Sequence, residues 1–224
     1  MKTWYGVHRL AWLAGAAVVV SGCGSLSPFA EPLEWPSFPL HRTQEPAAPV
    51  SPAIAPHVIA DFNRPGHRTN DDLSYGAWNS DPGDPTQSCR VRLVDTERVG
   101  PEGFGLLIDY DVESPNPAYN GFWLKLPEVP LAAFGALSFS IKGDAQRGFT
   151  RRLRLELKDR SHVAGFQLEG ITAEWTQVQV PLRAFAGIEA LRRATEFVIV
   201  FDDETVTEKV GTVYLDNLTF EPTE

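Results

Sequence analysis

The stretch Arg152-Leu153-Arg154-Leu155-Glu156-Leu157-Lys158 decides the fold class, because leucine alternates with a charged residue at every step. Successive side chains of a β-strand point to opposite faces of the sheet. The stretch therefore predicts a strand with a leucine face toward a core and a charged face toward solvent. Residues 137–142, Leu-Ser-Phe-Ser-Ile-Lys, repeat the same period of two. Both stretches indicate a β protein.

Short segments of this kind follow one another from residue 57 to the end, separated by turn residues. Regularly spaced short strands with turns between them are typical of an all-β sandwich. The only helical candidate, residues 184–194, is short, and we expect it to form one or two turns between strands. The predicted strands are residues 57–62, 90–97, 104–111, 121–126, 137–142, 152–158, 162–168, 175–182, 196–202 and 212–220.

The N-terminus has the pattern of an export signal. Lys2 and Arg9 precede an apolar stretch, residues 10–20, that is too short to span a bilayer. The run Val20-Ser21-Gly22-Cys23 that ends it resembles the cleavage site of a bacterial lipoprotein signal peptide. The resemblance implies that residues 1–22 are removed and that Cys23 becomes the first residue, carrying palmitate and other acyl chains. Gly24 then favours the outer membrane if the cell is Gram-negative, so we expect a lipid-anchored protein of the cell envelope.

A proline-rich segment separates this signal from the predicted strands. Eight prolines occur between residues 24 and 56, without a helix or strand period between them. Such density favours extended polyproline II segments that act as a semi-rigid spacer. We therefore expect three regions: a signal peptide (residues 1–22), a lipidated cysteine with a linker (23–56) and one β-sandwich domain (57–224).

Net charge and cysteine content limit the partners and the disulfides that we expect. The formal net charge of −9 argues against nucleic acid as a partner, because such proteins need a basic patch to displace counterions. The chain has two cysteines. If Cys23 carries lipid, Cys89 has no partner within the chain, and we expect no intramolecular disulfide and a buried Cys89.

Alternation places one tryptophan among polar residues. In residues 121–126, Phe122, Leu124 and Leu126 share one face, so Trp123 lies on the other. Residues 152–158 and the segment after Trp175 are divided between faces in the same way. We expect these strands to present one polar sheet face, whose candidate ligand contacts are Trp123, Arg152, Arg154, Glu156, Gln177 and Gln179.

Two interpretations of this face stay open. A pyranose ring can stack on indole while its hydroxyl groups pair with Gln, Arg and Glu side chains, so the face suits a sugar. It can equally be an ordinary solvated sheet face. Tyr75 and Trp78 lie in a predicted loop, residues 70–78, where they would either wall one end of the groove or pack over the core.

Several longer runs resemble galactose-binding-like jelly rolls, in particular the carbohydrate-binding modules of bacterial cellulases and β-glucanases. The resemblance covers residues 57–221 and implies a jelly-roll β-sandwich that binds a glycan or polysaccharide on its concave sheet face. The runs that carry it are Tyr-Asn-Gly-Phe-Trp-Leu-Lys-Leu at 119–126, Leu-Ser-Phe-Ser-Ile-Lys-Gly-Asp at 137–144, Ile-Thr-Ala-Glu-Trp at 171–175 with Val-Pro-Leu at 180–182, and Val-Tyr-Leu-Asp-Asn-Leu-Thr-Phe at 213–220.

The same resemblance implies a structural calcium ion with oxygen ligands from the first and last strands, here around Asp61 and Asp216. Asn63 stands where the family often has a glutamate, which argues for a weaker or missing site. In the alternative interpretation, Asp216 only hydrogen-bonds backbone near the N-terminal strand.

The common catalytic signatures are absent from the sequence: no Gly-x-Ser-x-Gly, His-Glu-x-x-His, phosphate-binding glycine loop or Cys-x-x-Cys occurs. Carboxylates are abundant, but their separation, on which glycosidase chemistry depends, is not readable from sequence. We expect a non-catalytic carbohydrate-binding lipoprotein. The alternatives are a structural or assembly module that binds another envelope protein through the same fold, and a glycan-processing enzyme.

Overall fold

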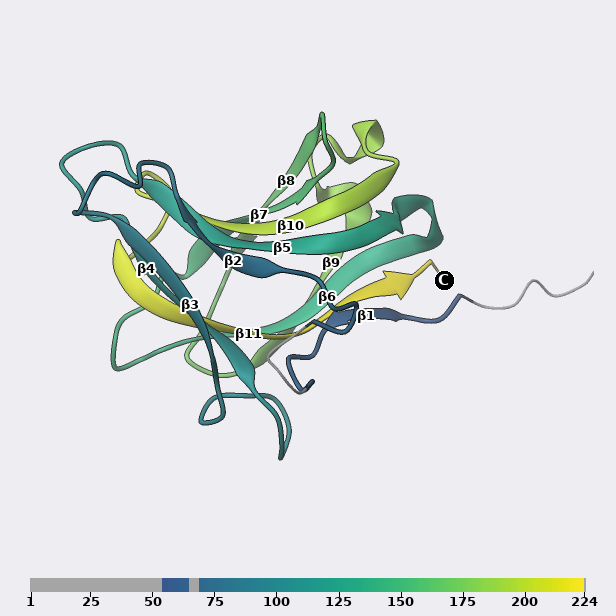
Figure 1. Cartoon of the computed structure of the whole chain (residues 1–224), viewed down its shortest axis with the longest axis horizontal. Coiled ribbons are helices and arrows are strands. Elements are labelled where there is room, and N and C mark those ends of the chain that lie inside the picture. The colour runs from purple at the N-terminus through teal and green to yellow at the C-terminus, as the bar shows by residue number, and fades with distance from the viewer. Residues whose placement is uncertain (1–53, 65–68, 224) are drawn as a thin grey trace, which may run out of the picture. The chain divides into compact units, whose positions relative to one another are not determined.

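A computed structural model describes residues 54–64 and 69–223. The signal peptide, Cys23 and almost all of the linker therefore lie outside the described residues. The described part forms two antiparallel sheets that pack face to face, which confirms the all-β class (Figure 1). None of its helices is long and apolar enough to cross a membrane.

One sheet contains six strands. Its hydrogen-bonded order is β3-β4-β11-β6-β9, and β1 pairs with β11. The long strand β11 pairs with β4 through Leu215 and with β1 from Leu218 onward, so two strands share one of its edges. Asn217 lies between these two pairings in the left-handed conformation, with φ of 54°. The strands are β1 (His57–Ala60), β3 (Ser88–Val94), β4 (Gly105–Asp111), β6 (Phe134–Gly143), β9 (Thr176–Pro181) and β11 (Val210–Pro222).

The other sheet contains five strands in the order β2-β5-β10-β7-β8. Figure 1 shows β5 and β10 bowed toward the six-stranded sheet, so the outer face of the five-stranded sheet is concave. Bending of this kind follows from the natural twist of strands and from bulges in the pairing. The strands are β2 (Tyr75–Asn79), β5 (Tyr119–Pro130), β7 (Arg152–Lys158), β8 (Val163–Glu169) and β10 (Arg193–Asp202).

The core fills the space between the two inner faces. On β7 the three leucines are fully buried, as the alternation predicted. Tyr110 of β4 stacks on Phe201 of β10 across the two sheets, with ring centroids 4.0 Å apart and planes 4° from parallel. Cys89 is a buried free thiol, and burial raises the pKa of this thiol to about 12. The core of this domain is therefore aliphatic and aromatic, and it uses Cys89 as a small apolar residue.

Two local predictions need correction or refinement. Residues 70–78 were expected to be a loop, whereas Tyr75–Asn79 form strand β2. Its sequence, Tyr-Gly-Ala-Trp-Asn, mixes two strand-favouring aromatic residues with glycine, alanine and asparagine, and all five positions are half-buried, so alternation does not mark it as a strand. Residues 184–194 were expected to form one or two helical turns; they contain the 3₁₀ turn Ile188–Ala190, and a second 3₁₀ turn, Leu182–Ala184, ends where the range begins.

Candidate functional site

The concave outer face of the five-stranded sheet carries the candidate site. The pairing register sets its side chains in rows across the strands. The central row runs Gly76, Trp123, Val198, Glu156, Gly165, from β2 to β8. The row on one side contains Lys125, Glu196 and Lys158, and the row on the other side contains Trp78, Gly121, Val200, Arg154 and Gln167.

Each tryptophan of this face stands opposite a glycine on the neighbouring strand. Trp123 of β5 pairs with Gly76 of β2, and Trp78 of β2 pairs with Gly121 of β5. A Cβ atom placed on Gly76 would lie 3.1–3.2 Å from Cζ2, Cε2 and Nε1 of Trp123. Three ring atoms at nearly the same distance mean that the indole rests with its face on β2. The glycine therefore allows Trp123 to lie flat on the sheet surface.

Charged side chains surround the tryptophans in a chain of ion pairs. Lys125 pairs with Glu196, and its Nζ also lies 5.5 Å from the centre of the Trp123 ring. Glu156 accepts from both Lys158 Nζ, at 2.8 Å, and Arg154 Nε, at 3.0 Å. The Arg154 guanidinium lies 3.0–3.2 Å from where a Cβ would stand on Gly165, so a second glycine lets it extend flat over β8.

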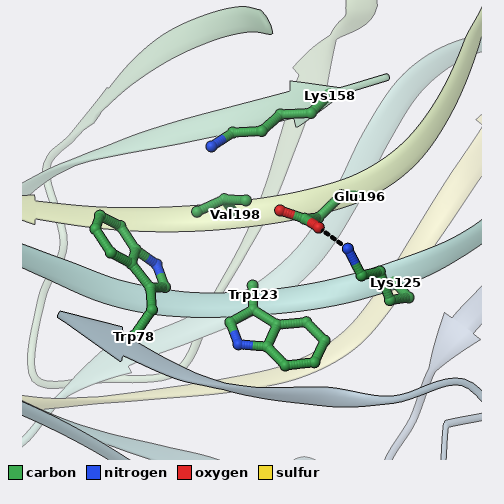
Figure 2. Close-up of a pocket in the computed structure, with 6 residues that line it drawn as sticks. All are labelled: Trp78, Trp123, Lys125, Lys158, Glu196 and Val198. Carbon is green, nitrogen blue, oxygen red and sulfur yellow. Dashed lines mark hydrogen bonds and ion pairs between the residues drawn. The ribbon is translucent and has the colours of Figure 1, made fainter. Parts of the chain in front are cut away.

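Six residues of this face enclose a depression of about 340 Å³: Trp78, Trp123, Lys125, Lys158, Glu196 and Val198. Figure 2 shows Val198 at its centre, with Trp78 on one side and the Glu196–Lys125 pair on the other, and with Trp123 and Lys158 on opposite flanks. The result is a shallow apolar floor between two aromatic rings, with three charged groups at the rim. Such a surface can take up an apolar ring face and donate or accept hydrogen bonds at its margin.

Solved structures of other proteins share this two-sheet architecture. The domain is similar to the family 11 carbohydrate-binding module from Clostridium thermocellum solved with a β-1,3-1,4-mixed-linked tetrasaccharide, with a TM-score of 0.56 and 16% identity over 76% of this chain and 98% of that one. It is also similar to the family 30 module of a cellulosomal cellulase of Clostridium thermocellum, with a TM-score of 0.51 and 13% identity over 76% and 99% of the two chains. This chain has the jelly-roll fold of carbohydrate-binding modules.

At these identities the likeness shows the fold alone. An exo-β-agarase contains the same jelly roll, with a TM-score of 0.52 and 13% identity, over 75% of this chain but 25% of the agarase. The jelly roll therefore corresponds to a minor part of that larger protein. No protein-family model and no curated protein matches the sequence.

The jelly roll brings together only some of the predicted contact residues. Trp123, Arg154, Glu156 and Trp78 share the concave face. Arg152 is on the same strand as Arg154, but its Nε donates to the Thr205 carbonyl oxygen at 2.6 Å, outside the depression.

Three of the predicted contacts do not belong to this face. Gln177 and Gln179 are exposed on β9, which belongs to the six-stranded sheet, so the expectation of one shared polar face is wrong. Alternation assigns a residue to a face of its own strand but does not say which sheet the strand joins. Tyr75 packs against Phe62 and Phe122 on the inner side of β2, opposite to Trp78.

The structure adds four residues that were not among the candidates: Lys125, Lys158, Glu196 and Val198. Lys125 and Lys158 already stood on outward positions of recognised strands, so alternation alone could have nominated them. Glu196 and Val198 could not be found this way, because their contribution depends on β10 lying between β5 and β7.

The residues expected to bind calcium meet at the junction of β1 and β11. Asp216 is 1% exposed, and its carboxylate accepts from the backbone N–H groups of Val99 and Asn217, both at 2.8 Å. Burial raises the pKa of Asp216 to about 6, and the nearby charge of Asp61 adds to the effect. Among the described residues, no group of three or more His, Cys, Asp or Glu side chains could hold a metal together.

Asn63, where the resemblance often implies a glutamate, forms hydrogen bonds within the protein. Its Oδ1 accepts from the backbone N–H of Phe104 at 3.1 Å. Its own backbone N–H donates to Asp61 Oδ1 at 3.1 Å, and Asn70 Nδ2 donates to Asp61 Oδ2 at 3.1 Å. All four oxygens of Asp61 and Asp216 thus accept a hydrogen bond within the protein. These two carboxylates are the only predicted calcium ligands that the described residues bring to this junction, and Asn63 Oδ1 is engaged by Phe104.

Proposed function

We propose that this protein is a non-catalytic carbohydrate-binding lipoprotein that holds a glycan on the concave face of its five-stranded sheet. The observation that carries the proposal is the pair of tryptophans, each opposite a glycine, with the Trp123 indole lying flat across β2. A flat indole presents its π face to the C–H face of a sugar ring. Because the ring is already held by the sheet, little side-chain entropy is lost when the ligand binds.

The ion pairs at the rim support the same role. Lys125, Lys158 and Arg154 each have a carboxylate partner, so their positions are restrained before a ligand arrives. They offer donors, and Glu156 and Glu196 offer acceptors, for the hydroxyl groups at the edge of a sugar. A glycosidase needs one carboxylic acid that carries a proton. The two carboxylates beside the tryptophans, Glu156 and Glu196, are instead engaged with cations, and we propose that binding occurs without turnover.

The first test is a screen of glycans and insoluble polysaccharides with a chain of residues 24–224. We expect binding to at least one polysaccharide, and Trp123→Ala to weaken it by about 1 to 3 kcal/mol, a range taken from base stacking on aromatic side chains. The matched control is the double variant Gln177→Ala/Gln179→Ala, which alters the other sheet and should bind normally.

The outcomes separate the alternatives. No binding to any glycan by a folded chain would overturn the proposal and favour recognition of another envelope protein through the same face. Release of reducing ends from a bound polysaccharide would contradict the non-catalytic role.

The anchor and the metal belong to the same proposal. Cys23 would carry the lipid, and the proline-rich linker would act as the spacer that joins it to the jelly roll. Asp61 and Asp216 would hold a structural calcium ion, which would neutralise the buried Asp216 carboxylate and join the first strand to the last. The raised pKa of Asp216, to which the negative charge of Asp61 contributes, supports a cation at this place.

A further inference from the structure

Three arginines surround a depression at one end of the sandwich, away from the tryptophans. Arg160, Arg192 and Arg193 line a hollow of about 350 Å³. Ser161 and Thr195 add hydroxyl groups to its wall. Its two acidic lining residues are Glu128 and Asp159.

The arginines are held by two adjoining elements. Arg160 and Ser161 form the turn between β7 and β8, where Asp159 Oδ1 accepts the N–H groups of Ser161 and His162 at 2.7 Å each. Arg192 and Arg193 lead into β10, and the Arg192 carbonyl oxygen accepts from the Leu131 N–H at 3.2 Å.

A bulge in β5 lies beside these arginines. The register between β5 and β10 shifts there, and Glu128 adopts the left-handed conformation, with φ of 52°. Bulges and non-glycine residues in this conformation are over-represented next to functional sites.

The cations of this hollow are only partly balanced by nearby carboxylates. Among the described residues, none of the three arginines forms an ion pair, and Arg193 Nη1 donates a long hydrogen bond, 3.5 Å, to the Glu128 carbonyl oxygen. Asp159 is already engaged by its own turn and by His162 Nδ1, at 3.3 Å. Against Glu128 and Asp159, the three arginines leave one uncompensated positive charge in a chain whose formal net charge is −9.

We propose that Arg160, Arg192 and Arg193 form a binding site for a phosphate group. Guanidinium groups present planar, paired N–H donors that match the oxygens of a phosphate, and they stay charged at all physiological pH values. The hydroxyl of Ser161 adds a donor beside them. At physiological ionic strength the negative charges elsewhere on the chain are screened beyond about 8 Å, so the local arrangement decides the attraction.

The position of the hollow points to the headgroup of a membrane lipid as the source of this phosphate. Arg192 contacts Leu131, which leads into β6 at Phe134, and the Phe134 ring lies 6.3 Å from His57 at the start of β1. Figure 1 shows the end of β5, the end of β11 and the start of β1 at the same end of the sandwich. The linker joins the jelly roll at this end, just before β1. The lipid assignment rests on the anchor proposed at Cys23, because tethering raises the effective concentration of a weak contact.

Nuclear magnetic resonance tests the site directly. A ¹⁵N-labelled chain of residues 24–224 is titrated with inorganic phosphate at constant ionic strength. We expect saturable shifts confined to the amides of residues 159–162 and 192–195. Arg160→Gln/Arg193→Gln should weaken phosphate affinity at least about tenfold, because two charge-assisted contacts are lost. Arg183→Gln changes an exposed arginine that lines a depression with Pro56, outside the hollow; it is the control and should bind normally.

Unchanged affinity in the double variant, or unsaturated shifts spread over the surface, would overturn the proposal. If the double variant does not fold, the single variant Arg160→Gln replaces it in the phosphate titration, because Arg160 lies in the turn between β7 and β8 and not within a strand. Co-sedimentation with vesicles then identifies the source of the phosphate. Sedimentation with phosphatidylglycerol vesicles that the Arg160→Gln variant loses supports a lipid headgroup, whereas phosphate binding without sedimentation overturns the lipid assignment.

Discussion

Gly76 has no side chain to lift the Trp123 indole from the sheet, so a residue on β2 determines how a ligand contact on β5 is displayed. Gly165 has the same relation to Arg154 on the opposite side of the face. Both glycines belong to the central row, one at each edge strand. The flatness of the site is thus set by the residues that face its ligand contacts across the strands.

Gly76→Val should reduce glycan affinity although it removes no contact group. A Cβ 3.1 Å from the indole, with two methyl groups beyond it, forces the ring to tilt. We expect a loss of about 1 to 3 kcal/mol, as for Trp123→Ala, without loss of thermal stability, because valine favours strands more than glycine does. Binding isotherms for the parent, the two single variants and the double variant give the binding free energies of a double-mutant cycle. If Gly76→Val still weakens binding in the Trp123→Ala background, the tilting mechanism is wrong.

Alternation was sufficient to predict Trp123, Arg154 and Glu156 as outward residues, because their strands have clear apolar faces. It failed for Tyr75, whose strand carries glycine and asparagine and was not recognised. It also grouped Gln177 with Trp123, since the period of two contains no information on sheet membership. The face of a residue is thus a local property, whereas its partners on that face depend on long-range pairing.

At the scale of elements, β4 is joined to two loops by a single hydroxyl group. Tyr110 Oη donates to the Glu208 carbonyl oxygen at 3.0 Å and accepts from the Thr150 N–H at 2.7 Å, while its ring stacks on Phe201. Thr150 is fully buried, so water cannot replace the lost acceptor easily. The segments that lead into β7 and β11 are therefore both held to β4 through the Tyr110 side chain.

Tyr110→Phe should lower the free energy of unfolding by about 1 to 3 kcal/mol, because it leaves a buried N–H and a carbonyl group unpaired. Urea denaturation followed by tryptophan fluorescence measures the change. Tyr119→Phe is the matched control, since Tyr119 is 47% exposed, and it should leave stability within about 0.5 kcal/mol of the parent. Equal effects of the two substitutions would refute the role given to the Tyr110 hydroxyl.

The raised pKa of Asp216, at the junction of β1 and β11, predicts that the free energy of unfolding falls as the pH rises. Its folded-state pKa of about 6 exceeds the ordinary 3.8, so the folded chain holds a proton that the unfolded chain has lost between these values. The contribution to stability is full below pH 3.8 and is lost as pH rises toward 6, by up to about 3 kcal/mol. Urea denaturation at pH 4 and at pH 7 in a chelator measures it. Asp216→Asn should remove this slope, and an unchanged slope in the variant would assign it to other groups.

Calcium should reverse this loss if Asp61 and Asp216 bind it. Thermal unfolding at pH 7 should move upward when calcium replaces chelator, because a ligand that binds only the folded state stabilises it. The shift should be absent in Asp216→Asn. An equal shift in both proteins would place calcium elsewhere, and no shift in the parent would remove calcium from the proposed function.

Most strands were predictable because each buries one face, which imposes a period of two on its sequence. Their irregularities were not. The left-handed residues Glu128 and Asn217 mark bulges where the partner strand shifts register, and neither is a glycine that would signal the bend. Bulges depend on how two strands meet, so one strand's sequence does not reveal them.

On the scale of the whole molecule, the proposed lipid at Cys23 decides where the jelly roll acts. Cys23→Ser should move the protein from the membrane fraction to the soluble fraction and abolish labelling by a palmitate analogue. Cell fractionation with immunoblotting and metabolic labelling measures both effects. A parent protein that takes no label, or a variant that stays in the membrane fraction, would contradict a lipid anchor.

The class of the whole fold was accessible from sequence, but its layering was not. Ten short alternating segments predicted a sandwich, and the resemblance to carbohydrate-binding modules predicted the jelly roll. The order of strands follows from pairings distant in sequence, such as β1 with β11, for which the period of each strand gives no signal. The concave site depends on this order, since its depression is formed by β2, β5, β10 and β7 together.

Strand β2 has five residues, lies at the edge of its sheet and pairs there only with β5. One tryptophan of the site belongs to β2, and the other rests on it. A glycan that covers both rings would therefore bridge the two strands and add its binding free energy to the pairing of this edge strand. Amide protons of β2 should then exchange with deuterium more slowly in the bound protein, while those of the central strand β10 keep their free-state rates. The ligand would thus stabilise the pairing of an edge strand that has a neighbour on one side only.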